Sequence, residues 1–414
     1  MFKKLGIIIL VFAMVLSVCA FSASATETAP VIFIKDGGEG DGSSPDQALG
    51  LGDSGEAWAD APLYQAWEAL KETGGTIVIC GPYTLKAADQ YVNPNNGQAR
   101  PGAPDIIMDG WYRNPDVTIT YTSVWDGVDY RQTADAKLIF DDSNISLTFP
   151  TATVLKDLTV VAGGNPAGDN RDNYLCAAYN PLTLGKGTNF LANANGELPV
   201  VVGGQRNYSG IAAVDGDTNI TVDLGSGNAI GAVYGNLGYT NKNQYGSSYI
   251  TVKSGTVNGI YGDNQFNHGF GLSGSINITI SGGTIVGEVA ATNGGIPVNA
   301  FDRPVTPVVN ITISGGDFSK CTGIKATSSF YDEVVAVGGY KDAVQAPGEI
   351  TIDCSKASQK VYDKVASLTS LNVTAPEGGA SSDTAPATGD ALSMVIALMA
   401  VAATGLVVLK KRAF

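Results

Sequence analysis

A short phrase that recurs five times between residues 219 and 353 restricts the fold more than any other feature of this sequence. Each copy places isoleucine, threonine and then valine or isoleucine in a row, and neighbouring copies lie 28 to 39 residues apart. The copies alternate apolar with polar residues and are rich in β-branched side chains, which is typical of strands with one buried face. Their central isoleucines are Ile220, Ile250, Ile278, Ile311 and Ile350.

This spacing predicts a parallel β-solenoid, because a unit of about 30 residues with short strands cannot bury its apolar face alone but can stack on its neighbours. Propeller blades need longer units, and leucine-rich repeats need a leucine and asparagine scaffold that this sequence lacks. We expect the five isoleucines to form one inward stack and the threonines after them an outward ladder. In the first four copies a turn glycine follows five residues after the isoleucine, at Gly225, Gly255, Gly283 and Gly316.

Less regular strands are expected upstream, at 76–80, 117–121, 137–140, 145–149, 158–162 and 200–203. An amphipathic helix precedes them, with Asp60 as its expected N-cap, Pro62 in its first turn and Gly74 as its stop. Leu63, Trp67 and Leu70 lie on one face of this helix.

The strand at 31–34, the loop from Asp41 to Pro45, this helix and the segment from Gly74 to Tyr83 together resemble the opening of pectin-lyase-like β-helix proteins. The resemblance implies an all-β fold, a right-handed parallel β-helix (solenoid) with an N-terminal capping helix. A cap is physically needed, because the first coil would otherwise expose its core and an unpaired strand edge. Lyases, hydrolases, epimerases and inert adhesins share this fold, so the resemblance does not select a function.

The N-terminus is typical of a secretory signal peptide, with Lys3 and Lys4, an apolar run from Leu5 to Phe21, and the small residues Ala23 and Ala25 before the expected cleavage point. At the other end, 391–409 is long and apolar enough for a transmembrane anchor helix and is followed by three basic residues.

The segment before that anchor resembles the LPxTG sorting signal of Gram-positive surface proteins, through Ala385, Pro386, Thr388 and Gly389. The resemblance implies that a sortase attacks the carbonyl of Thr388, releases Gly389 onward and joins the chain to peptidoglycan. Ala385 stands where the motif has leucine, which leaves the class of sortase open. A membrane anchor that is never cleaved is the alternative.

The expected organisation is therefore a signal peptide at 1–25, the N-terminal cap at 26–75, the parallel β-helix at 76–376, a flexible tether at 377–384 and the sorting signal at 385–414. The chain carries 25 basic and 39 acidic residues, a net charge of −14. Nucleic acid is excluded as a partner, since these scattered basic residues cannot form a basic face. Four widely spaced cysteines follow the signal peptide, and they permit a single disulfide or buried free thiols.

Candidate catalytic residues are sparse. His268 is the only histidine, and Asp263 could orient it. Arg206 and Arg303 are the basic residues that a lyase site could use. The repeat positions that would display paired carboxylates on neighbouring coils are weakly filled, so we expect no glycosidase pair there.

Two candidate ligand sites remain. The loop with Asp36, Glu39 and Asp41 could hold a structural calcium ion, which is the sole cofactor we consider, although its order is not that of an EF-hand. Aromatic residues at Trp111, Tyr112 and Trp125, with Tyr121 and Tyr130 near them in sequence, could stack on sugar rings or on a partner. The alternative is that these rings pack over the side of the solenoid.

These observations favour a secreted, cell-wall-anchored surface protein that is a non-enzymatic, adhesin-like or glycan-binding scaffold. Its expected partners are a sortase, peptidoglycan, and a carbohydrate or host-surface ligand. The alternative function is a wall-tethered polysaccharide lyase or glycoside hydrolase.

Overall fold

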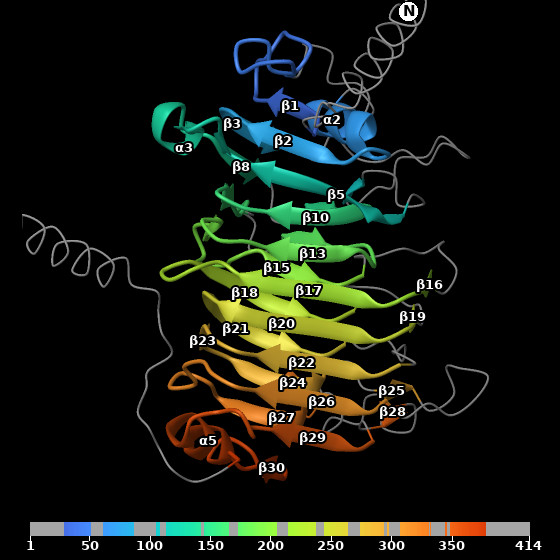
Figure 1. Cartoon of the computed structure of the whole chain (residues 1–414), viewed down its shortest axis with the longest axis vertical. Coiled ribbons are helices and arrows are strands. Elements are labelled where there is room, and N and C mark those ends of the chain that lie inside the picture. The colour runs from blue at the N-terminus through green and yellow to red at the C-terminus, as the bar shows by residue number, and fades with distance from the viewer. Residues whose placement is uncertain are drawn as a thin grey trace, which may run out of the picture. The chain divides into compact units, whose positions relative to one another are not determined.

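The computed structural model describes residues 29–50, 61–86, 105–107, 113–141, 145–164, 173–204, 214–236, 244–263, 274–293, 296–297, 307–330, 332, 344–345 and 348–377 (Figure 1). The expected signal peptide and the expected sorting signal with its anchor helix lie outside these ranges. Within them, no helix has the length and the apolar character that crossing a bilayer requires.

The chain is mostly β, with long parallel sheets that are compatible with a β-solenoid. It divides into two compact units, Met1–Arg206 and Asn207–Phe414, and each is described by itself.

Unit 1 contains three parallel sheets, here called 1A, 1B and 1C, which the chain visits in turn. One visit to each sheet is a coil. Sheet 1A consists of β1 (Val31–Ile34), β2 (Gly75–Ile79), β5 (Asn114–Thr122), β10 (Thr151–Leu155) and β13 (Pro181–Leu184). Sheet 1B consists of β3 (Pro82–Leu85), β8 (Lys137–Phe140), β11 (Thr159–Val161) and β14 (Asn189–Leu191). Sheet 1C consists of β4 (Asp105–Ile107), β9 (Ser146–Thr148), β12 (Tyr174–Cys176) and β15 (Val200–Val202).

All six strands expected upstream of the repeat are confirmed, with shifted ends. Their apolar residues align from coil to coil, and in sheet 1A one inward column contains Ile77, Tyr121, Leu155 and Leu184. All four side chains are 1% exposed or less. Burial of a large apolar side chain contributes about 1.5–3 kcal/mol, so these columns are the main stabilising element of unit 1.

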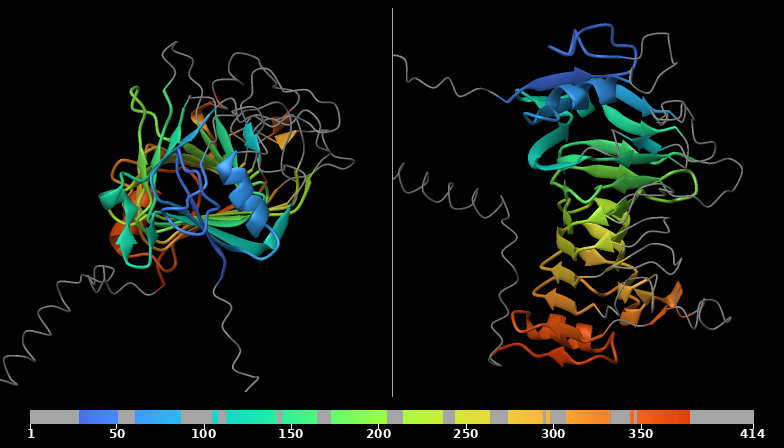
Figure 2. Two further views of the ribbon diagram at one scale, coloured as in Figure 1. Left: turned by 90° about the horizontal axis from the view of Figure 1, so that it is seen from above. Right: turned by 90° about the vertical axis from the view of Figure 1, so that its right-hand side faces the viewer.

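The N-terminal end of unit 1 is covered by α2 (Pro62–Leu70) and by the loop after β1 (Figure 2). The helix buries Leu63, Trp67 and Leu70, as expected, and it ends at Leu70, whose carbonyl accepts a hydrogen bond from the N–H of Gly74, a residue with a φ of 73°. The helix N-cap is Ala61, without a side-chain hydrogen bond, so the expected N-cap at Asp60 is wrong.

The loop from 36 to 49 pairs with the outer edge of β1. Phe33 N–H donates to the carbonyl of Gly42, and Leu49 exchanges hydrogen bonds with Phe33 and Lys35. The edge strand is therefore hydrogen-bonded on both sides, which protects it from pairing with another chain.

Unit 2 contains two long parallel sheets. Sheet 2A consists of β17 (Thr218–Asp223), β20 (Ser248–Ser254), β22 (Ile276–Ile280), β26 (Val309–Ile313), β29 (Ile350–Asp353) and β30 (Val373–Thr374) (Figure 1). Sheet 2B consists of β18 (Ala229–Tyr234), β21 (Thr256–Tyr261), β24 (Glu288–Thr292) and β27 (Gly323–Thr327), with β23 (Thr284–Ile285) also paired to β21. Two small pairs complete the unit: β16 (Val214–Asp215) with β19 (Gln244–Tyr245), and β25 (Ile296–Pro297) with β28 (Val344–Gln345).

The inward isoleucine stack is confirmed for the first four copies of the phrase and is wrong for the fifth. Ile220, Ile250, Ile278 and Ile311 pair in register and are 1% exposed or less. Ile311 then pairs with Ile352, whereas Ile350 pairs with Val309. The outward ladder accordingly consists of Thr221, Thr251, Thr279 and Thr312. It continues in Asp353 and not in Thr351.

The four turn glycines after the phrases share one backbone conformation. Gly225, Gly255, Gly283 and Gly316 have φ values of 84°, 90°, 82° and 109°. L-residues with a side chain rarely adopt such values, so glycine is required wherever the chain bends from sheet 2A towards sheet 2B.

The C-terminal end of unit 2 has its own cap, α5 (Gln359–Ala366) (Figure 2). Ser358 is its N-cap and accepts a hydrogen bond from the N–H of Val361. Residues after the helix then cover the last strands: Leu368 accepts from Ile324 of β27, and β30 pairs with β29. The last coil thus has hydrogen-bond partners beyond the repeat.

The four cysteines in the described ranges are free and buried: Cys80, Cys176, Cys321 and Cys354. Of the two alternatives, the structure therefore has buried thiols and no disulfide. Burial raises the pKa of Cys80 and Cys321, and it raises the pKa of Cys354 to about 11. Because the thiolate is the reactive form of cysteine, the raised pKa disfavours reaction of these three thiols in the folded chain.

The corrected register makes a direct prediction. Replacement of Ile352 by Ala leaves a cavity in the stack and should destabilise unit 2 by about 2–5 kcal/mol. Ile350→Ala should cost clearly less, because Ile350 is half-buried. Thr351→Ala, at an exposed position between them, is the control and should change stability by about 0.5 kcal/mol or less. Urea unfolding followed by circular dichroism measures all three, and an equal loss for Ile350→Ala and Ile352→Ala would contradict the register.

Candidate functional site

A short antiparallel hairpin leaves unit 1 between β5 and β8. It is formed by β6 (Val124–Trp125) and β7 (Val128–Asp129), joined by Asp126 and Gly127. These two turn residues have φ values of 48° and 76°. Two consecutive positive φ values are what a type I′ turn requires, and Asp-Gly is one of its preferred pairs. The local sequence therefore specifies the hairpin.

Trp125 and Val128 pair across this hairpin and are both exposed, at 37% and 39%. Asp126 is exposed between them in sequence. We call Trp125, Asp126 and Val128 the hairpin tip. A large ring beside an aliphatic side chain and a carboxylate offers an apolar surface for stacking together with a hydrogen-bond acceptor.

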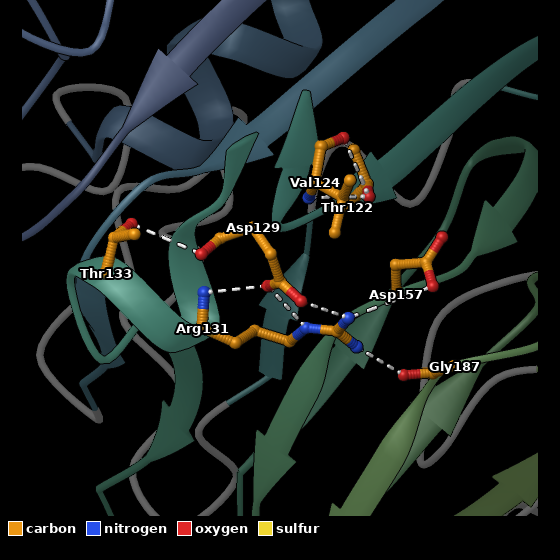
Figure 3. A network of polar contacts seen from close by, with 7 residues as sticks. All are labelled: Thr122, Val124, Asp129, Arg131, Thr133, Asp157 and Gly187. Carbon is orange, nitrogen blue, oxygen red and sulfur yellow. Dashed lines mark hydrogen bonds and ion pairs between the residues drawn. The ribbon is translucent and has the colours of Figure 1, made fainter. Parts of the chain in front are cut away.

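Arg131 fixes the base of the hairpin (Figure 3). Its Nε donates to Asp129 Oδ1 at 2.8 Å and its Nη2 to Asp129 Oδ2 at 2.7 Å, and Asp129 Oδ1 also accepts from the backbone N–H of Arg131. This bidentate pair holds the pKa of Asp129 below its ordinary value, chiefly through the hydrogen bonds from Arg131. Asp129 is also the N-cap of α3 (Tyr130–Thr133), so one carboxylate orders both the hairpin and the helical turn.

The same guanidinium reaches two later turns of unit 1. Nη1 donates to the carbonyl of Gly187 at 2.7 Å, and Nη2 lies 3.9 Å from Asp157 Oδ1 (Figure 3). Asp157 follows β10 and Gly187 follows β13, so Arg131 ties the hairpin to the next two coils. Gly187 has a φ of 76°, which favours glycine, and a Cβ there would lie 2.1 Å from Asp157 Oδ1.

Tyr130 supports the hairpin from the opposite side. It is half-buried and packs against Phe33, Ala48, Val78 and Cys80, between β1, its covering loop and β2. Burial raises the pKa of its hydroxyl, with smaller contributions from the charges of nearby acidic groups. The hairpin tip is thus presented by a base that is held on both sides, and a contact surface that is ordered beforehand loses less entropy when it binds.

The structure separates the aromatic residues that sequence grouped together. Tyr121 is 1% exposed and packs edge-on against Phe149, with ring centroids 5.6 Å apart, so it belongs to the core. Trp125 is exposed on β6, while Trp111 and Tyr112 lie outside the described residues. Of the three expected contact residues, the structure therefore describes Trp125, at the hairpin.

Of the expected catalytic residues, Asp263 lies in the part of the chain that the structure describes. Asp263 is 1% exposed, and its carboxylate accepts hydrogen bonds from the Thr292 hydroxyl and from the N–H of Asn293 at 2.6 Å. His268, Arg206 and Arg303 lie outside the described residues. Their proposed roles therefore stay predictions.

The candidate calcium loop has its acidic side chains turned to separate partners. Asp36 accepts from the N–H and the hydroxyl of Thr84, and Asp41 accepts from the N–H of Ser43. A hydrogen bond from Ser43 lowers the pKa of Asp41. Across the described ranges, no three acidic, histidine or cysteine side chains are grouped as metal ligands would be, so calcium at this loop stays a prediction.

Sequence reasoning missed one charged cluster in unit 2. The Glu288 carboxylate is 8% exposed and accepts hydrogen bonds from Ser329 N–H at 3.1 Å and from the Ser329 hydroxyl at 2.9 Å. Lys325 Nζ lies 3.4 Å from Glu288 and donates to the Ser329 hydroxyl at 2.7 Å. Glu288 also raises the pKa of Tyr261, after burial, through its charge and a hydrogen bond between the two side chains.

This cluster contains the residue types of a catalytic site, but its hydrogen bonds and ion pair are those of a structural contact. A general base needs a lone pair directed at substrate, whereas Glu288 already accepts from Ser329, Lys325 and Tyr261. Lys325 Nζ lies between the Glu288 carboxylate and the Ser329 hydroxyl, to which it donates. The cluster therefore fastens the end of β27 to β24 and β21. Asp263 lies beside Thr292, four residues along β24 from Glu288, roughly 13 Å away and too far to act with it as a glycosidase pair.

Comparison with protein-family models, curated proteins and solved structures found no match to this chain.

The clamp at Arg131 leads to a prediction about stability. Arg131→Gln removes charge-assisted hydrogen bonds that are largely shielded from solvent and should destabilise unit 1 by about 1–3 kcal/mol at neutral pH. Because the folded pKa of Asp129 is depressed, its contribution is present above the unfolded pKa of about 3.9 and is lost as pH falls through the folded value. The difference between wild type and variant should therefore shrink in acid.

Urea unfolding at neutral and at acidic pH measures this difference. Lys137→Gln is the matched control, because it breaks an ion pair with Asp135, whose side chain is 76% exposed, and should have almost no effect. If the difference in the free energy of unfolding between wild type and Arg131→Gln did not change with pH, the stabilising partner of Arg131 would not be Asp129.

Proposed function

We propose that this chain is a secreted surface protein that a sortase joins to peptidoglycan, and that it acts as a non-enzymatic, adhesin-like scaffold. The signal peptide at 1–25 and the sorting residues Ala385, Pro386, Thr388 and Gly389 support the export and the anchoring. Both proposals rest on sequence, and each can be tested on the intact protein.

We infer that the coils form a right-handed parallel β-helix. The parallel pairing and the cyclic order of sheets 1A, 1B and 1C support a solenoid. The right hand is inferred from the rule that connections between parallel strands of one sheet are right-handed in about 98% of cases.

The hairpin tip is the observation that carries the binding function. Trp125 is an exposed large ring on a two-residue turn, yet its base is held by Arg131 and Tyr130. Trp125 leaves 37% of its surface exposed, and the rigid presentation of this ring supports a role in contact with a ligand. A sugar ring is the ligand that this chemistry favours, because its C–H face can stack on the indole while its hydroxyls donate to Asp126.

The first test concerns this ligand. The full chain, purified in detergent, is screened on a glycan array and incubated with polysaccharides to detect cleavage products. Trp125→Ala should weaken binding of any glycan that the wild type binds by about tenfold or more, since a central aromatic contact is worth about 1.4 kcal/mol or above.

Leu191→Ala is the control, because Leu191 is 43% exposed on β14 and lies outside the hairpin tip. Binding that survives Trp125→Ala unchanged would remove the hairpin from the proposal. Cleavage products without stable binding would favour the polysaccharide lyase or hydrolase.

The second test concerns anchoring. Thr388→Ala alters the residue whose carbonyl the sortase would attack, and the variant should move from the peptidoglycan-linked fraction to the membrane or the medium of a Gram-positive host that has a sortase. Thr384→Ala, four residues earlier, is the control and should remain wall-linked. Equal wall linkage of the two variants would argue for an anchor that is not cleaved by a sortase.

A further inference from the structure

The outward face of sheet 2A has a column of polar side chains that is interrupted at one position. Five consecutive strands of the sheet each contribute one residue to it: Asn219, Tyr249, Asn277, Asn310 and Thr351 (Figure 1). The asparagines form a ladder, because Asn310 Nδ2 donates to Asn277 Oδ1 at 3.0 Å and Asn277 Nδ2 donates to Ser275 Oγ at 2.8 Å. At the next strand the ladder meets Tyr249 and stops.

Tyr249 is distinguished by its place in the repeat more than by its exposure. Its side chain is 39% exposed, and a single exposed ring is ordinary on a protein surface. The repeat, however, shows which residue folding can use here, since asparagine occupies the position in the coils of Asn219, Asn277 and Asn310. Among the described residues, the side chain of Tyr249 makes no hydrogen bond or ring contact. The exception in the repeat therefore indicates a role other than folding.

Three neighbouring side chains keep polar groups available around the ring. Asn219 pairs with Tyr249 from β17 and is exposed, and Thr251 follows two residues later on the same face of β20. Thr221 pairs with Thr251, and both are half-buried. Within the described ranges, none of these three side chains has a hydrogen-bond partner. Neighbouring strands lie about 4.8 Å apart and alternate residues of a strand about 6.6 Å apart, so one small ring-shaped ligand can reach all four side chains.

We propose that these three side chains and Tyr249 form a binding site for a neutral sugar, here called the sheet 2A site. The C–H face of a sugar ring can stack on the tyrosine. The hydroxyls of the sugar both donate and accept hydrogen bonds, and an amide with two threonine hydroxyls offers donors and acceptors together. The sheet 2A site rests on the glycan-binding function proposed above, but its residues are separate from the hairpin tip.

The charges around the sheet 2A site favour a neutral ligand. Asp217 and Asp223 lie two residues before and after the site along β17, and Lys253 lies two residues after it along β20. Both carboxylates are engaged in the sheet, since Asp217 accepts from the N–H of Ser247 at 2.8 Å and Asp223 from the hydroxyl of Ser254 at 2.6 Å. An acidic glycan would meet more negative than positive charge there. A protein partner would need a larger apolar centre than one ring among polar groups.

The test uses the full chain in detergent on an array of neutral and acidic glycans. Tyr249→Asn introduces the residue that the repeat has in the other coils, and it should weaken binding of neutral glycans by about tenfold or more, because a central aromatic contact is lost. Tyr249→Phe keeps the ring and should retain binding. Phe330→Ala is the matched control, because Phe330 is 40% exposed and follows β27 of sheet 2B, and it should leave binding unchanged.

Urea unfolding of the same variant separates a binding role of Tyr249 from a packing role. Because asparagine occupies this position in three other coils, Tyr249→Asn should unfold at the same urea concentration as the wild type or at a higher one. A clearly lower midpoint of unfolding would mean that the ring stabilises its coil. That result would overturn the proposal whatever the array shows.

Comparison with Trp125→Ala keeps the sheet 2A site apart from the hairpin tip. Binding of neutral glycans that falls in Tyr249→Asn supports the sheet 2A site, whether or not Trp125→Ala also loses it. Binding that Tyr249→Asn leaves unchanged would overturn this site, and a loss in Trp125→Ala would then show that the proposed function stands without it. A wild type that binds acidic glycans alone would also overturn it. A wild type that binds no glycan would remove both the site and the glycan-binding function.

Discussion

A strand in either unit buries its apolar face only because the strand of the next coil lies beside it in register. No single coil has a core of its own, so the inward columns of isoleucine, leucine and valine must match from one coil to the next. Sheet 2A shows how strict this is: four isoleucines from four coils pair directly and exclude water almost completely. The caps follow from the same constraint, since the first and last coils each lack one neighbour. In unit 1 a loop and α2 fill this role, and in unit 2 α5 and β30 do so.

The features that could be predicted from sequence are those that recur in every coil, because the coils must match in register. The phrase around Ile220, Ile250, Ile278 and Ile311 is recognisable because each coil needs the same inward residue at the same place. The wrong isoleucine was assigned to the stack in the fifth copy because Glu349-Ile350-Thr351-Ile352 contains two isoleucines, which are two residues apart and lie on the same face of the strand. A shift of one residue would reverse the faces of the strand and would be detectable in the pattern, whereas a shift of two residues leaves every face unchanged. Only the pairing of Ile311 with Ile352 decides between them.

The functional features were harder to predict, because their partners are distant in sequence. Trp125 was a candidate from its residue type alone, but the clamp that orders it depends on Arg131 meeting Gly187 and Asp157 from later coils. Glu288 carries no local sequence signal, since Lys325 and Ser329 reach it from about 40 residues further on. Asp263 was considered as a partner of His268, which lies outside the described residues, and the contacts of its carboxylate with Thr292 and Asn293 come from the next coil. The stacking of coils brings residues together that are one coil apart in sequence, so no local sequence motif marks such a site.

The register of unit 2 also shows where a protein of this kind can change without losing its core. From the isoleucine column of sheet 2A to the column of Val233, Ile260, Val289 and Ile324 in sheet 2B, the chain needs between 10 and 13 residues in every coil. On the way back, the connections are 17, 18, 22 and 28 residues long. The connection from sheet 2A to sheet 2B, which contains the positive-φ glycine, therefore varies little in length. The connection back to sheet 2A differs in length from coil to coil, so each coil can accept an insertion there without affecting the others. Natural variation and deliberate grafting alike should concentrate on that second edge, where new sequence can be added one coil at a time on an unchanged framework.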